Sequence, residues 1–124
     1  MTTNFEAPTV LVVEDDFNIR ETLRDALEID GYQVVTADNG REALDKIHAG
    51  PKPDLILLDM MMPVMSGREF LDAAGADAKI APIPVVVISA TADATSARGA
   101  AAFIKKPPDL ELILQMVAKY TNRS

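Results

Sequence analysis

Acidic, hydroxyl and basic side chains stand directly after short apolar runs in this sequence. They are Glu14 and Asp15 after the first run, Asp59 after the third, Ser89 after the fourth, and Lys106 shortly after the fifth. Carboxylates that crowd together repel one another, which raises the pKa of at least one of them unless a cation lies between them. Oxygen ligands without His or Cys suit Mg²⁺, a hard ion that often co-binds phosphate oxygens. The pattern therefore points to magnesium and phosphate chemistry.

Phosphoryl transfer to a carboxylate needs an oxygen nucleophile, a divalent cation, and cationic or hydrogen-bonding groups for the transferred oxygens. Asp59 is the candidate nucleophile, and Glu14 and Asp15 are candidate metal ligands. Lys106 and Ser89 are candidates for binding the phosphoryl oxygens. Simpler roles stay open at this point. Asp59 and Ser89 could be turn residues, the acidic pair could favour a helix N-terminus, and Lys106 could be a solvated charge.

The apolar runs predict the strands that position these groups. They cover residues 9–13, 33–37, 54–58, 84–88 and 101–104. The runs are continuous and several are rich in Val and Ile, which is typical of strands buried on both faces of a parallel sheet. In open α/β sheets, ligands bind outside the carboxyl ends of the strands. We therefore expect the candidate residues to meet at one edge of a sheet.

Helical patterns fill the gaps between the runs. Asn18, Asn39 and Ser66 each stand three residues before a Glu, the spacing of a capping box, and a last helical pattern begins near Pro108. The alternation of strands and helices predicts a doubly wound α/β domain. Between the fourth and fifth runs the sequence is barely long enough for a full helix with its two connections. A short, irregular or missing helix is expected there.

Length and charge bound the function. The 124 residues make one small domain, which we assign to residues 9–124, with residues 1–8 as an N-terminal extension. The net charge of −7 argues against nucleic acid or a membrane surface as the main partner, because both are polyanionic. No apolar run approaches the roughly 20 residues that span a bilayer. With no Cys and no signal-peptide pattern, the sequence predicts a cytoplasmic protein without membrane insertion.

Taken together, the motifs resemble the receiver domain of bacterial two-component response regulators, from Val10 to Tyr120. The matching segments are, in order, Leu11–Asp15, Leu57–Pro63 followed by Ser66 and Gly67, Val87–Ala90, Gly99–Ala100, and Phe103–Pro107. Any one of these segments alone is weak evidence for the family. Their occurrence in this order, at successive strand ends, is highly specific.

The resemblance implies a flavodoxin-like fold with five parallel strands in the order 2-1-3-4-5. It implies that Asp59 accepts a phosphoryl group from a sensor histidine kinase or a histidine phosphotransfer protein. Glu14 and Asp15 match the acidic pair of the family's Mg²⁺ site. Asp15 and Asp59 would bind the ion through their side chains, and Met61 through its backbone carbonyl.

Three further residues match the family's switch. Ser89 corresponds to the hydroxyl residue that turns inward to bond the phosphate, and Lys106 to the lysine that pairs with it, before a usually cis bond to Pro107. Phe103 corresponds to the aromatic residue whose side-chain conformation follows phosphorylation. The stretch from Ser89 to Lys106 is shorter than in the family, and the shortfall lies in the fourth helix, part of the usual output surface.

The sequence therefore predicts a receiver that signals through phosphorylation-dependent binding of a downstream protein target, or acts in a phosphorelay. It would catalyse only its own phosphorylation and dephosphorylation, so we do not class it as an enzyme. One alternative is a pseudo-receiver, an interaction module that is never phosphorylated; such proteins usually lack the Asp, the acidic pair or the Lys. A second is a Mg²⁺-dependent phosphohydrolase, although those enzymes carry Asp-x-Asp after the first strand, and here Asp59-Met-Met follows the third.

Overall fold

Five parallel strands form the central layer of the computed structural model, which describes residues 7–90, 98–107 and 109–121. The strands are β1 (Thr9–Val13), β2 (Gln33–Ala37), β3 (Leu55–Asp59), β4 (Val85–Ser89) and β5 (Ala102–Lys105). The helices are α1 (Phe17–Ile29), α2 (Gly40–Ala49), α3 (Gly67–Gly75) and α4 (Leu110–Tyr120). The strand order β2-β1-β3-β4-β5 confirms the predicted doubly wound, flavodoxin-like fold.

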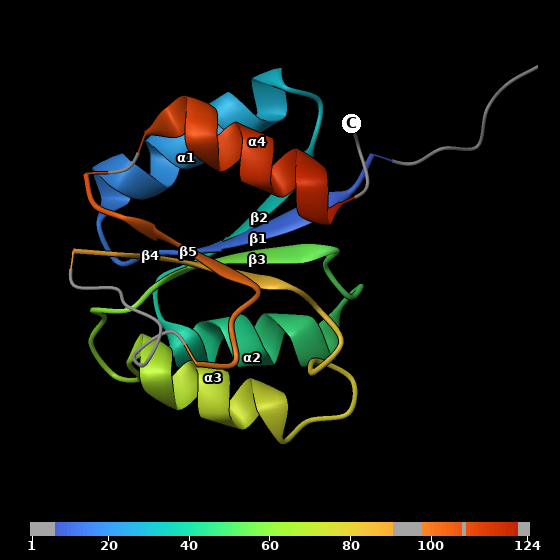
Figure 1. The fold of residues 1–124 in the computed structure, drawn as a ribbon. Helices are drawn as coiled ribbons and strands as arrows, with labels where there is room; N and C mark the ends of the chain where they lie inside the picture. Colours follow the sequence, from blue (N-terminus) through green and yellow to red (C-terminus); the bar gives the residue numbers. More distant parts are fainter. Residues whose placement is uncertain (1–6, 91–97, 108, 122–124) are drawn as a thin grey trace, which may run out of the picture.

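The sheet is covered on both faces. Figure 1 shows α1 and α4 on one side of the sheet and α2 and α3 on the other. All five residues of β3 and all five of β4 are buried, as their continuous apolar runs predict. Alternate strand side chains enter two separate apolar clusters, one with Phe70 of α3 and the other with Leu27 of α1. This packing holds the strand ends in a fixed relation to one another.

Two of the three predicted helix caps are confirmed, and one is wrong. Ser66 and Glu69 form a complete capping box at the start of α3, and Asn39 caps α2 by accepting a hydrogen bond from the amide of Glu42. Helix α1 is capped by Asp16, which accepts from the amide of Ile19, and not by Asn18. Asp16 and Asn18 are equally good capping residues, and the chain turns into the helix directly after the acidic pair.

The last three strands each begin and end one residue later than predicted. Asp59 and Ser89 are therefore the final residues of β3 and β4, paired in register with Ile88 and Lys105 respectively. The predicted cis bond between Lys106 and Pro107 is confirmed. The expected short or irregular helix between β4 and β5 falls largely on residues 91–97, outside the described residues. Within the described part of the chain, no helix is long and apolar enough to cross a membrane.

Candidate metal centre

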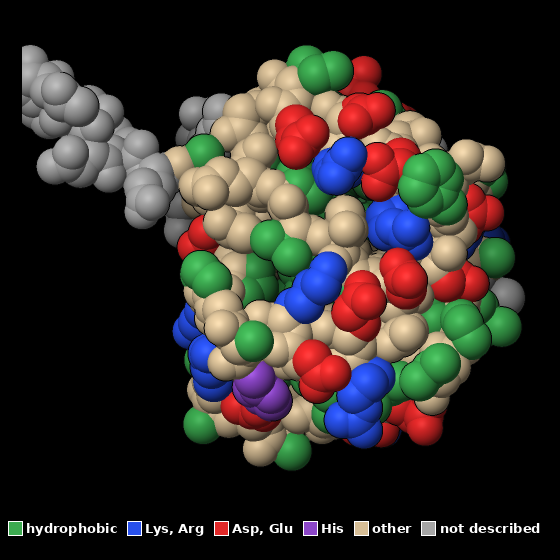
Figure 2. Space-filling view, turned by 180° about the vertical axis from the view of Figure 1, so that it is seen from behind, with side chains coloured by type: hydrophobic (Ala, Val, Ile, Leu, Met, Phe, Trp, Pro, Cys, Tyr) green, Lys and Arg blue, Asp and Glu red, His purple; other side chains and the backbone are tan. Residues whose placement is uncertain are grey.

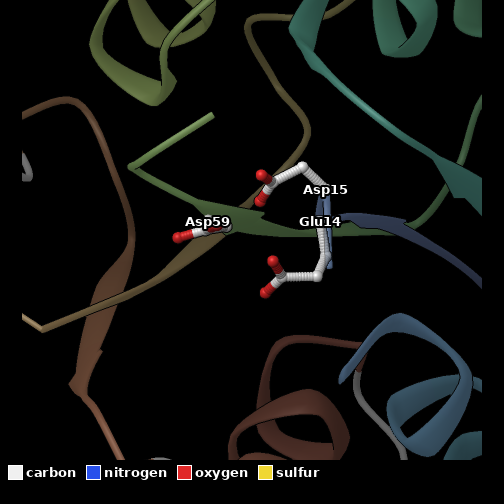
Figure 3. A group of neighbouring side chains, drawn as sticks. All are labelled: Glu14, Asp15 and Asp59. Atoms are coloured by element: carbon white, nitrogen blue, oxygen red, sulfur yellow. The ribbon is translucent and has the colours of Figure 1, made fainter. Parts of the chain in front are cut away.

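Three carboxylates converge at the carboxyl end of the sheet. Glu14 and Asp15 follow β1, and Asp59 ends β3. Their ligand oxygens all lie within 4.8 Å of one another, and in Figure 3 the Glu14 and Asp15 carboxylates are both turned to the side on which Asp59 lies. This meeting follows from the topology, because β1 and β3 are neighbouring parallel strands whose ends lie side by side.

Burial makes it energetically unfavourable to keep these carboxylates ionised without a positive charge nearby. Glu14 and Asp59 are each 3% exposed, whereas Asp15 is exposed to solvent. Burial, with the neighbouring charge and hydrogen bond of Asp59, raises the pKa of Glu14 to about 8, although the amide of Asp16 and the charge of Lys106 act in the opposite direction. In the absence of a metal, Glu14 therefore holds a proton near neutral pH.

Lys106 supplies a positive charge from the other side of the cluster. Its Nζ lies 3.3 Å from Asp59 Oδ1 and 3.8 Å from Glu14 Oε1. Its backbone N–H donates to the Ser89 carbonyl at 2.9 Å, which fixes the chain after β5 against the end of β4. One ammonium cannot balance the three carboxylates when all of them are ionised. The all-oxygen donor set, the crowding of its charges and the solvent-facing Asp15 therefore fit a hard divalent cation.

The remaining predicted residues lie around this cluster. Ser89 is 1% exposed at the end of β4, next to β3 in the sheet. The amide of Met61 donates to Asp59 Oδ1 at 3.2 Å, while the Met61 side chain is largely exposed. Phe103 is on β5 and partly exposed. The metal-binding carbonyl of Met61 and the switch roles of Ser89 and Phe103 stay predictions.

The loop between β3 and α3 is tightly constrained. The amide of Gly67 donates to the Met60 carbonyl at 3.1 Å, and the amide of Met65 donates to the Pro63 carbonyl at 2.7 Å. The intervening Val64 has a φ of 68°, a left-handed conformation that is unfavourable for a β-branched residue. The loop after Asp59 is thus held in a strained shape by its own hydrogen bonds.

Arg20 is a neighbour of the site to which the sequence analysis assigns no role. Its NH1 group donates to the Glu14 carbonyl at 2.9 Å and pairs with Asp38 Oδ1 at 3.2 Å. The only sequence signal is its position on the first turn of α1, four residues after the Asp16 cap, which turns it back toward the strand end. An arginine on a helix surface is common, so this signal alone carries little weight.

His48 lies outside the site and contacts Asp77. Its Nε2 is 2.6 Å from Asp77 Oδ2, and this contact lowers the pKa of the Asp77 carboxyl. In Figure 2 the His side chain, in purple, lies beside an acidic one, and basic side chains are interspersed with acidic ones on this face. This face therefore shows none of the continuous basic surface that nucleic-acid binding requires.

Comparison with known proteins gives a consistent result. The family model of the response regulator receiver domain matches residues 10–118. Response regulator MprA from Mycolicibacterium vanbaalenii is 39% identical over an alignment of 124 positions, which covers 93% of this chain and 51% of that protein. The chain therefore spans about half the length of the MprA relatives it matches.

Solved structures agree with this result. Chemotaxis protein CheY4 from Vibrio cholerae has a TM-score of 0.85 and 30% identity, covering 93% of this chain and 99% of that one. Response regulator protein TrrA from Thermotoga maritima, solved in complex with Mg(2+)-BeF, has a TM-score of 0.81 and 32% identity, covering 91% of this chain and 98% of that one.

Proposed function

The chain belongs to the response regulator receiver domain family of two-component signalling systems, and from this membership we propose that Asp59 accepts a phosphoryl group from a phosphohistidine in a Mg²⁺-dependent reaction. The observation that carries this proposal is the convergence of Asp59 with two further carboxylates and the Lys106 ammonium at one sheet edge. A carboxylate nucleophile, ligands for a hard cation and a cationic group for phosphoryl oxygens are the parts that the reaction needs.

Mg²⁺ would be held by the carboxylates of Asp15 and Asp59 and by the backbone carbonyl of Met61, with Glu14 supporting the site. When bound, the ion supplies positive charge that offsets the repulsion between the nucleophile and the phosphoryl oxygens. The exposed Asp15 leaves the site open to water and to an incoming phosphoryl group. Burial of Asp59 keeps its carboxylate in a fixed orientation.

In the proposed step, an oxygen of the Asp59 carboxylate attacks the phosphorus of the phosphohistidine. A P–O bond forms, the P–N bond breaks, and its electron pair stays on the imidazole nitrogen. The product is an acyl phosphate on Asp59 and a free histidine on the donor. Lys106, 3.3 Å from Asp59 Oδ1, is placed to bind an oxygen of the transferred group.

Phosphorylation of Asp59 would change the conformation of residues at the ends of the neighbouring strands. The Ser89 hydroxyl would turn to the phosphoryl group, and Phe103 would respond on the neighbouring strand β5, which ends at Lys105. The change would alter the surface offered to a downstream protein target, or the phosphoryl group would move on in a phosphorelay. The chain would act only on its own Asp59, so we do not class it as an enzyme.

The alternatives have less support. The four residues whose loss marks a pseudo-receiver are all present and lie together at the site. The receiver family match, with Asp59 on the third strand, disfavours a phosphohydrolase. The cytoplasmic location inferred from the sequence stays a prediction, as does the assignment of residues 1–8 to an extension.

Incubation with acetyl phosphate and Mg²⁺ tests the proposal. We expect intact-mass spectrometry to show one added phosphoryl group, and we expect chelation of the metal with EDTA to prevent its addition. Equal phosphoryl uptake with and without EDTA would contradict the role of the metal. Absence of phosphoryl uptake together with absence of Mg²⁺ binding would instead favour the pseudo-receiver.

The raised pKa of Glu14 makes a prediction about pH. Because the carboxyl holds its proton below about pH 8 in the metal-free protein, binding of Mg²⁺ must displace that proton. We expect Mg²⁺ affinity to rise by up to about tenfold per pH unit as the pH approaches 8 and then to level off. Calorimetric titration at several pH values measures this. Glu14→Gln is the control and should remove most of the dependence, whereas a flat profile for the unaltered protein would contradict the assignment.

The same shift affects stability in the metal-free protein. The folded state holds the Glu14 proton more tightly than the unfolded chain, whose carboxyl has the ordinary pKa of 4.5. The free energy of unfolding should therefore fall as pH rises from 4.5 toward 8, through this group's contribution. Mg²⁺ should restore the lost stability above pH 8, because it binds the ionised form.

A further inference from the structure

Arg20 makes three contacts around the acidic loop after β1. Its NH1 group donates to the Glu14 carbonyl at 2.9 Å and lies 3.2 Å from Asp38 Oδ1, and its guanidinium carbon is 5.4 Å from the centre of the Phe17 ring. The Arg20 side chain is 13% exposed. It is therefore largely enclosed and tied to two loops that are distant in the sequence.

The group that Arg20 holds is the peptide unit between the two acidic residues. Successive side chains of an extended segment point to opposite sides of the chain. Figure 3 shows the Glu14 and Asp15 side chains leaving the end of β1 on opposite sides, with both carboxylates turned to the side of Asp59. The relative direction of the two side chains is set by the backbone torsion angles on either side of this peptide, ψ of Glu14 and φ of Asp15. Holding its carbonyl at one position therefore limits how far the two carboxylates can turn away from each other.

The backbone of Glu14 is held on both sides, by the end of β2 through its amide and by Arg20 of α1 through its carbonyl. The amide of Glu14 donates to the Ala37 carbonyl at 3.0 Å, and the carbonyl of Glu14 accepts from Arg20. The next residue, Asp38, holds the guanidinium, and its own amide donates to Glu42 Oε1 at 2.9 Å. A charged donor makes a stronger hydrogen bond to a carbonyl than water does.

We propose that Arg20 is a positioning residue that sets the Glu14–Asp15 peptide so that both carboxylates face the metal. The inference rests on the proposed function, because it takes Mg²⁺ as the ligand of the cluster. A positioning role and a purely electrostatic role predict opposite changes in Mg²⁺ affinity when Arg20 is removed. Removing a nearby positive charge would by itself make the acidic cluster more attractive to a cation, whereas loss of positioning makes Mg²⁺ binding weaker.

The test uses Arg20→Gln beside Arg24→Gln. Both variants lose one positive charge from α1, but Arg24 pairs with Glu21 on the helix surface. We expect Arg20→Gln to weaken Mg²⁺ binding by about tenfold, the range found when an outer partner of a metal ligand is removed. Arg24→Gln should stay within about twofold of the unaltered protein, and Arg20→Lys, which keeps one charged donor, should recover part of the affinity.

Calorimetric titration with Mg²⁺ gives the dissociation constants, and urea unfolding without metal gives the stability of each variant. A structural role alone would lower the free energy of unfolding and leave the affinity of the folded protein unchanged.

If Arg20→Gln does not fold, Asp38→Asn replaces it in the test, because it loosens the guanidinium without removing the bond to Glu14. Asp38→Asn should weaken Mg²⁺ binding several-fold. Unchanged or tighter Mg²⁺ binding in the folded variant would overturn the inference, as would absence of Mg²⁺ binding by the unaltered protein. Phosphoryl uptake by the unaltered protein is a separate measurement, and its absence would overturn the proposed function instead.

Discussion

Asp59→Asn should take up no phosphoryl group under conditions in which the unaltered chain takes up one. The substitution replaces an ionised nucleophile with an amide that cannot form an acyl phosphate, and it leaves the shape of the side chain nearly unchanged. Asp59 is 3% exposed and makes its contacts with Lys106 and the Met61 amide through one oxygen. Intact-mass spectrometry after incubation with acetyl phosphate and Mg²⁺ measures the effect.

The Asp59→Asn protein should still fold, so a negative result can be interpreted. Removing the Asp59 charge relieves its repulsion of Glu14, so the pKa of Glu14 should fall, although burial, the larger cause, still holds it above its ordinary value. Asp16→Asn is the matched control, because it makes the same chemical change at the exposed cap of α1, where Asn is an equally good residue. Normal uptake is expected in that control. Full uptake by Asp59→Asn would place the acceptor elsewhere.

Gly67→Ala should destabilise the protein and disturb the site together. A Cβ atom at Gly67 would lie 2.6 Å from the Met60 Cα and 3.0 Å from the Asp59 carbonyl oxygen. Both are backbone atoms, so the clash can be relieved only by moving the loop that follows β3. We expect the free energy of unfolding to fall by about 1–3 kcal/mol, the usual cost of overpacking, and Mg²⁺ affinity to fall with it.

Two other glycines provide graded controls for this effect. An added Cβ at Gly75 meets no atom within 4 Å, so Gly75→Ala near the end of α3 should be neutral or slightly stabilising. At Gly40 the three atoms nearest to the added Cβ, the first at 2.8 Å, all belong to the flexible Met65 side chain, so the loss there should be smaller. Urea unfolding of the three variants gives the comparison. Equal stability in Gly67→Ala and Gly75→Ala would contradict the close approach of α3 to the loop.

The strands and the α/β class could be predicted from the apolar pattern, whereas the strand order 2-1-3-4-5 was implied by the resemblance to receiver domains. Continuous runs such as those of β3 and β4 have no polar face, so a sheet covered on both sides is their only stable environment. The ends of the elements were harder to predict. Asp59 and Ser89 are polar and were expected to follow their strands, but their backbones continue the ladder with the neighbouring strand. Side-chain type does not report backbone pairing at a strand end.

The residues of the site could be predicted where their position depends only on which strand ends lie next to each other. The meeting of Glu14, Asp15 and Asp59 follows from strand order, and crowded carboxylates predict that a pKa is raised. The sequence could not show that Glu14 is the group affected, because that depends on which side chain is buried. Nor could it show Arg20, because its contact is with a backbone carbonyl, and every residue in the sequence has one.

The most direct test of the account locates the phosphoryl group by chemical trapping. Borohydride reduces an acyl phosphate to an alcohol, so an aspartyl phosphate becomes homoserine, which peptide mass spectrometry identifies by position. After incubation with acetyl phosphate and Mg²⁺, we expect homoserine at position 59, and none there when EDTA is present. Homoserine at another position, or unreduced Asp59 in a chain that has gained a phosphoryl group, would contradict the assignment of Asp59 as the acceptor.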